Sequence, residues 1–172
     1  YVALAFLRKH PARVAGLVLS DTRATADDAA GKLARRISTE RVRADGNAAI
    51  VAQMLDRLVG ETTRKRRPGV YANVRGMLED ADPGAFARAQ AALAGGADPT
   101  PLLAGIDVPT HVVVGSEDVI VKVDDARALA RAIPNARLTV IEGAGHLPNL
   151  ECPDEFNAVI REEIERGDEA RR

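Results

Sequence analysis

Two loops of this sequence carry side chains that could form an acid–base pair. The first follows a short apolar stretch at residues 139–141, where a glycine-rich turn leads to His146. The second follows an apolar stretch at residues 110–114 and ends in Asp118. Histidine titrates near physiological pH and can act as a general base. His146 is therefore the candidate base, and Asp118 is the candidate carboxylate that orients it.

The spacing between these two residues fits a parallel β-sheet. Asp118 and His146 are 28 residues apart, which leaves room for one helix and one strand, as in a single parallel crossover. The carboxyl ends of parallel strands lie at one edge of an open sheet, where ligands and catalytic groups gather. We therefore expect the two side chains to meet across neighbouring strand ends.

The elements that would position these loops predict an α/β fold. An apolar run at residues 14–19, bounded by turn residues, is typical of a strand that is buried on both faces. Apolar stretches predict two further strands, at residues 110–114 and 137–141. Helical patterning predicts helices at residues 1–9, 123–133 and 153–165. The predicted core consists of three parallel strands with flanking helices.

A long helical segment separates the first predicted strand from the second. It is predicted to contain helices at residues 27–43, 48–59, 70–78 and 83–93, with a basic connector at residues 64–68. A single crossover needs only about a dozen residues, so the segment indicates an inserted all-helical lid. The predicted organisation is core at residues 1–22, lid at residues 23–103 and core again at residues 104–172.

Composition and charge argue against several classes of function. A net charge of −1 and an aromatic content of 3% do not favour a nucleic-acid partner, and the charge gives no attraction to an anionic membrane. Apolar runs are far shorter than the ~20 residues that span a bilayer. A single cysteine, Cys152, excludes an internal disulfide and fits a cytoplasmic location. The predicted partner is a small-molecule substrate, and the oligomeric state is left open.

Three segments, taken together and in order, resemble the C-terminal part of an α/β-hydrolase-fold enzyme. They lie at residues 18–22, 108–118 and 141–153, and they contain Val-Pro-Thr, Gly-x-x-Asp, Gly-x-Gly-His and Glu-x-Pro in that order. The resemblance is to the lid-bearing kind, which includes esterases and enol-lactonases. It implies that the predicted strands are the sixth, seventh and eighth of that fold. It also implies that Asp118 is the catalytic acid and His146 the catalytic base.

The same resemblance implies that the nucleophile precedes Tyr1. In such enzymes a Gly-x-Ser-x-Gly elbow comes just before the helix that we predict at residues 1–9. The chain has three serines, Ser20, Ser38 and Ser116, and none lies in such a motif. We therefore expect a chain that carries two of three catalytic groups and is inactive alone, with Ser, Cys or Asp as the nucleophile. The first strand would lack a neighbour, so we also expect poor solubility.

Several residues have alternative interpretations. Asp21 is the alternative catalytic acid, because some members of the fold place the acid after the sixth strand. Its structural role, which we favour, would be to bind the turn or to cap a helix. Met54, Met77 and Leu147 are predicted to line an apolar substrate pocket, and the two methionines also fit plain helix packing. His111 lies at the start of a predicted strand, at the opposite end from the expected catalytic groups, and is predicted to be structural.

The predicted function is hydrolysis of an ester, a lactone or a related carbonyl compound by a Ser-His-Asp mechanism. A cofactor-free haloperoxidase-like enzyme or a C–C bond hydrolase of the same fold would use the same residues. An alternative of another class is a non-catalytic binding module that holds a nucleotide or flavin. No Gly-x-Gly-x-x-Gly motif or P-loop follows any predicted strand, which argues against the binding module. No cofactor and no metal ligand are predicted.

Overall fold

A three-stranded parallel sheet organises the chain. The structure is a computed structural model that describes residues 1–23, 25–96 and 98–170. Across these residues the sheet order is β1–β2–β3, and the strands span Leu17–Ser20, Thr110–Gly115 and Arg137–Ile141. Leu17 is paired with Thr110, and His111 is paired with Arg137. The α/β fold with three parallel strands is therefore confirmed.

The central strand β2 is buried on both faces of the sheet. Val112 and Val114 point into one apolar cluster, and Val113 points into another. The first cluster also contains residues of β1 and of the helices α1 (Val2–Lys9) and α8 (Val123–Ala132), namely Leu4, Leu7, Leu17, Leu19, Ala126 and Leu129. The second contains Ile141 of β3 and Val159 of α10 (Pro153–Ala170). Burial on both faces explains the unbroken valine run.

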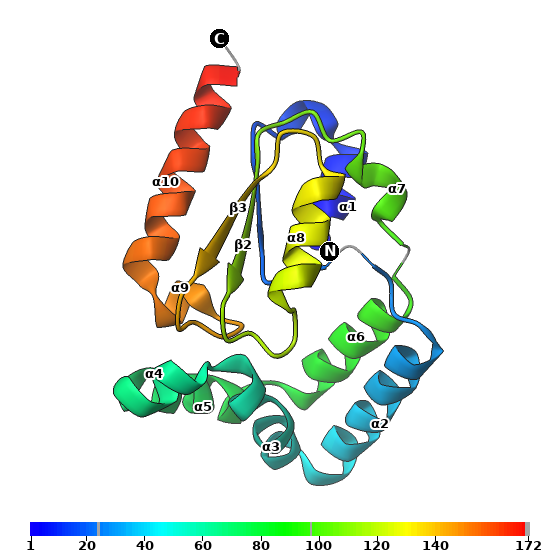
Figure 1. Ribbon diagram of the computed structural model, residues 1–172. Coiled ribbons are helices and arrows are strands. Elements are labelled where there is room, and N and C mark those ends of the chain that lie inside the picture. Colours follow the sequence, from blue (N-terminus) through cyan, green and yellow to red (C-terminus); the bar gives the residue numbers. More distant parts are fainter. Residues whose placement is uncertain (24, 97, 171–172) are drawn as a thin grey trace.

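The helices cover both faces of the sheet. Figure 1 shows α10 on one side of the sheet and α1 and α8 on the other. Helix α8 is the parallel crossover between β2 and β3, and the short elements η1 (Pro11–Arg13) and α9 (Pro148–Glu151) follow α1 and β3. No helix in the described ranges is both long and apolar enough to cross a membrane.

Six helices follow one another between β1 and β2. They are α2 (Ala29–Asp45), α3 (Asn47–Leu58), α4 (Glu61–Arg66), α5 (Pro68–Glu79), α6 (Pro83–Ala94) and α7 (Thr100–Leu103). Helix α2 packs on α6 and α3 packs on α5. Figure 1 places α7 beside α1, and it places α2 to α6 beyond the carboxyl ends of β2 and β3. Their position is that of a cover over the strand ends, while the predicted boundaries at residues 22 and 103 stay a prediction.

Two of the differences from the expected elements have a clear physical reason. Residues 61–66 form the helix α4, which overlaps the basic connector expected at residues 64–68. The helix is favoured because Glu61 lies in the first turn and pairs with Lys65 one turn later. Strand β1 begins at Leu17, three residues later than expected. The amide of Leu17 donates to the carbonyl of Pro109, and proline has no N–H with which to extend the ladder upstream.

Two of the helices begin after an aspartate whose side chain caps the first turn. The side chain of Asp28 accepts a hydrogen bond from the Gly31 amide at 2.7 Å, and Asp82 accepts one from Gly84 at 2.8 Å. Each carboxylate satisfies an amide that has no partner within its helix. Because Asp28 is the cap, α2 begins after it, and the neighbouring Asp27 is left to form ion pairs.

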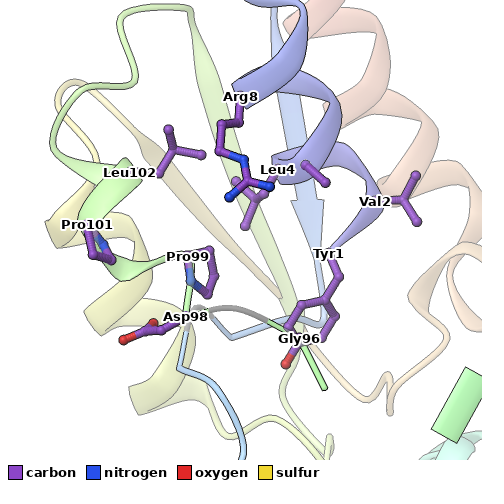
Figure 2. Close-up of a pocket in the computed structure, with 10 residues that line it drawn as sticks. Tyr1, Val2, Leu4, Arg8, Gly96, Asp98, Pro99, Pro101 and Leu102 are labelled. Atoms are coloured by element: carbon purple, nitrogen blue, oxygen red, sulfur yellow. The ribbon is translucent and has the colours of Figure 1, made fainter. Parts of the chain in front are cut away.

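A cavity of about 500 Å³ lies where α1 approaches the segment before α7 (Figure 2). Leu4, Leu102 and two prolines give it a largely apolar lining, and Arg8 and Asp98 are its charged residues. Neither of the loops that end β2 and β3 contributes to the lining. The cavity is therefore separate from the candidate acid–base pair.

Candidate active site

His146 and Asp118 are in direct contact at the carboxyl edge of the sheet. Their loops leave the adjacent strands β3 and β2, and Nδ1 of His146 lies 2.8 Å from Oδ2 of Asp118. The His146 side chain is 23% exposed, whereas the Asp118 carboxylate is fully buried. The geometry leaves one edge of the imidazole accessible and reserves the other for the carboxylate.

The local backbone keeps Asp118 ionised. Its Oδ1 accepts hydrogen bonds from the amides of Ile120 at 2.7 Å and Val121 at 3.1 Å. Burial alone would raise the pKa of Asp118, but hydrogen bonds from His146 and these amides outweigh it and lower the pKa below its ordinary value. An ionised Asp118 accepts the proton on Nδ1, so Nε2 of the neutral His146 ring is free to accept another.

The two loops lie against each other through close backbone contacts. The amide of Glu117 donates to the carbonyl of Ala144 at 2.8 Å, and the hydroxyl of Ser116 accepts from the amide of Gly143 at the same distance. A Cβ at Gly115 would overlap with the carbonyl oxygens of Ala144 and Gly145. Glycine is needed at the end of β2 because only its bare backbone lets the loops approach this closely.

Glu151 fixes the histidine loop and connects it to the turn between α3 and α4. Its side chain is fully buried and accepts hydrogen bonds from the amides of Gly60 at 2.8 Å, Gly145 at 2.9 Å and Leu147 at 3.2 Å. Gly145 and Leu147 flank His146, and Gly60 lies between α3 and α4. The Glu-x-Pro motif had marked this position in the sequence, but the pattern alone predicts no role for the carboxylate.

We expect the Glu151→Gln variant to lose about 1–3 kcal/mol of unfolding free energy. Glutamine has nearly the same shape, but its amide NH₂ would face backbone N–H donors and leave at least one of them without an acceptor. Urea denaturation measures the loss. Glu165→Gln, an exposed position on α10, is the matched control and should change stability by less than about 0.5 kcal/mol. Equal stability of both variants would contradict the role of Glu151.

Asp21, the alternative acid, is also at this edge but makes different contacts. Its Oδ1 accepts from the Gly115 amide at 3.0 Å, and the Ser20 hydroxyl donates to its Oδ2 at 2.6 Å. Burial raises the pKa of Asp21 to about 7, against the lowering effect of these hydrogen bonds. Asp118, and not Asp21, is hydrogen-bonded to His146. The contacts of Asp21 hold the turn after β1 against β2, which was its predicted non-catalytic role.

One donor atom each from Asp21, Asp118 and His146 lie within 4.8 Å of one another. Such a set could in principle bind a metal ion. However, two ligands of a tetrahedral zinc ion, each about 2.0–2.1 Å from the metal, would be about 3.3 Å apart. The Asp118–His146 contact of 2.8 Å is shorter than that and has the length of a charge-assisted hydrogen bond. The separation of Nδ1 and Oδ2 is therefore that of a hydrogen bond and not of two atoms that share one metal ion.

The residues predicted to line a pocket are not brought together. Met54 lines a cavity of about 700 Å³ that His146 also borders. Leu147 packs among Leu55, Val59 and Val74 of the helices instead. Met77 is 57% exposed and lies outside that cavity, because it is on the outer side of α5. Of the three predicted residues, Met54 lines the cavity that His146 borders, whereas Leu147 and Met77 do not.

His111 is far from this pair along β2 and has structural contacts. Its Nε2 lies 2.8 Å from the Thr139 hydroxyl, and its Nδ1 lies 3.6 Å from the buried carboxylate of Glu163. Burial lowers the pKa of His111 despite the nearby carboxylate.

Glu117, adjacent to Asp118, accepts hydrogen bonds from the amide and hydroxyl of Thr62 at the start of α4. Its carboxylate therefore connects the β2 loop to the helices, away from His146.

A parallel sheet with a buried carboxylate and a histidine beyond adjacent strand ends defines a class of α/β enzymes. The chain belongs to the alpha/beta hydrolase family, whose model matches residues 1–159. Its relatives are hydrolases. It is 31% identical to 3-oxoadipate enol-lactonase 1 of Acinetobacter baylyi over 117 residues, which are 68% of this chain and 43% of the lactonase.

Two solved structures extend this comparison. A thermophilic esterase from Thermogutta terrifontis, solved with malate bound, is 41% identical with a TM-score of 0.93 over 97% of this chain. An enol-lactonase from Burkholderia xenovorans LB400 is 26% identical with a TM-score of 0.82 over 94% of this chain. The chain spans 61% of that esterase and 60% of that lactonase.

Proposed function

We propose that this chain is part of a hydrolase that cleaves an ester, a lactone or a related carbonyl compound, with His146 as the general base and Asp118 as its partner. The observation that carries the proposal is the 2.8 Å contact between the ionised, buried Asp118 and Nδ1 of His146. The esterase and lactonase relatives support the same substrate classes.

The mechanism requires a nucleophile opposite Nε2 of His146. The nucleophile attacks the carbonyl carbon as Nε2 removes its proton, and the resulting imidazolium is stabilised by the carboxylate of Asp118. The same ring then returns the proton to the leaving group, and a water molecule releases the acyl group by the reverse sequence.

The serines of this chain are poorly suited to be that nucleophile. The Ser20 hydroxyl donates to Asp21, and the Ser116 hydroxyl accepts from Gly143. Ser38 lies within α2, where no sharp strand-to-helix turn presents its hydroxyl. We therefore propose that the nucleophile comes from residues that precede Tyr1 in the full-length protein, and a Gly-x-Ser-x-Gly elbow is the form expected there.

Two measurements test this proposal. The coding sequence upstream of Tyr1 should encode the elbow, and the protein from the complete open reading frame should react with a fluorophosphonate at the elbow serine. The 172-residue chain alone should remain unlabelled at Ser20, Ser38 and Ser116. Labelling of the short chain at one of these serines would contradict the position of the nucleophile. An aspartate or cysteine at the centre of the elbow would change the reaction class.

A further inference from the structure

The cavity that borders His146 has an unusual concentration of arginine. It measures about 700 Å³, which is within the range of small-molecule sites, and it extends from His146 to α2 and α3. Its lining includes four arginines, Arg23, Arg35, Arg41 and Arg57, against two aspartates, Asp21 and Asp27. The whole chain carries a net charge of −1, so the positive charge is a property of this cavity and not of the protein as a whole.

Two of these arginines have a partner within the protein. The buried Asp27 pairs with Arg23 at 2.9 Å and also with Arg35. Arg35 donates in addition to Gln90 at 2.9 Å. The hydrogen bond from Arg35 is the main cause of the lowered pKa of Asp27, so this carboxylate is ionised and offsets one guanidinium. Arg23 and Arg35 are thus committed to holding the start of α2.

The remaining pair, Arg41 on α2 and Arg57 on α3, has no such compensation. Among the residues that the structure describes, neither one forms an ion pair or a side-chain hydrogen bond with an acidic residue. The other acid of the cavity, Asp21, has a pKa raised by burial to about 7, so at neutral pH it supplies only part of a negative charge. The helices α2 and α3 pack together, and each contributes one of these two solvent-exposed arginines to the lining of the cavity.

We propose that the substrate carries a carboxylate at the end remote from the reacting carbonyl, and that Arg41 and Arg57 bind it. Guanidinium groups match the planar geometry of a carboxylate and can bind it bidentately. With the carbonyl at His146 and the carboxylate at these two arginines, the cavity would orient a short acid ester along its length. This inference rests on the proposed hydrolase function and adds the class of substrate.

The test compares two esters with the enzyme from the complete open reading frame. Monomethyl glutarate carries the carboxylate, and methyl pentanoate is a neutral ester of similar length. We expect kcat/KM to be higher for monomethyl glutarate. In the Arg41→Gln/Arg57→Gln variant this value should fall about 10- to 100-fold, as for the loss of one or two charged hydrogen bonds, while the value for methyl pentanoate changes less than about twofold.

Matched controls make the result specific. Arg36→Gln removes an exposed arginine of α2 that does not line the cavity, and it should leave both kcat/KM values unchanged. Glutarate should inhibit competitively and do so more weakly in the double variant, whereas sulfate at equal ionic strength should not inhibit. Far-UV circular dichroism checks that each variant is folded, and the two single variants should each show part of the loss.

The outcomes separate this inference from the proposed function. Hydrolysis of both esters with no preference for monomethyl glutarate, or an equal loss in Arg36→Gln, would overturn the carboxylate site and leave the hydrolase intact. Inhibition by sulfate as strong as that by glutarate would also overturn it, since the site would then bind any anion. If the folded enzyme hydrolysed none of the three substrates, namely the two esters and an activated aryl ester, the hydrolase function itself would be overturned.

Discussion

Replacing His146 by alanine in the enzyme from the complete open reading frame should lower kcat by about 10⁴- to 10⁶-fold. The variant keeps the cavity and the fold but has no group to remove the proton from the nucleophile or to return it to the leaving group. The side chain is partly exposed and its ring faces the cavity, so little packing is lost. Steady-state kinetics with an activated aryl ester measures the effect.

The matched control for this variant is His10→Gln. His10 is an exposed histidine at the end of α1, outside the cavity that His146 borders, and its loss should change kcat less than about twofold. If His146→Ala kept more than a tenth of the wild-type kcat, His146 could not be the base, and the 2.8 Å contact with Asp118 would be purely structural.

Replacing Asp118 by asparagine should lower kcat by about 10⁴-fold, because it changes the tautomer of His146. The asparagine oxygen can still accept from the Ile120 and Val121 amides. Its NH₂ group would then face His146 and donate to Nδ1. The ring proton would move to Nε2, which could no longer accept the proton of the nucleophile.

Asp21→Asn is the matched comparison for Asp118→Asn, because both residues are buried aspartates at the same sheet edge. Asparagine at position 21 can still accept from the Gly115 amide, and asparagine tolerates the positive φ of 46° found there. We expect kcat to fall less than about tenfold in Asp21→Asn. A loss of about 10⁴-fold in Asp21→Asn, together with a small effect of Asp118→Asn, would identify Asp21 as the catalytic acid instead.

Local patterns in the sequence were enough to predict much of the fold. Three local features predict parallel strands whose loops share one edge: the valine run of β2, the 28-residue spacing and the glycine-rich turn before His146. They can be recognised in the sequence because each involves residues that are close together along the chain. The same patterns fail for residues 61–66, where three basic residues hide the short helix α4. They also misplace the start of β1, which depends on a proline that is distant in sequence.

Some functional contacts had no signal in the sequence. The Glu151 carboxylate accepts hydrogen bonds from the backbone amides of Gly60, Gly145 and Leu147, and Gly60 is 91 residues away along the chain. Arg41 and Arg57 line one cavity only because α2 and α3 pack side by side. As sequence letters, both arginines are indistinguishable from the many charged residues on exposed helix faces.

Patterns along the chain were thus enough to predict the class of fold, the order of acid and base, and His146 and Asp118 as a candidate pair. The contacts of the folded chain were needed to learn which carboxylate contacts the histidine, which charges lack a partner and which apolar residues face a cavity. The two kinds of information differ in how far apart along the chain the interacting residues lie. Strand burial, turn geometry and helix periodicity depend on residues a few positions apart, whereas hydrogen bonding, desolvation and electrostatic compensation depend on whatever the folded chain brings within a few ångströms.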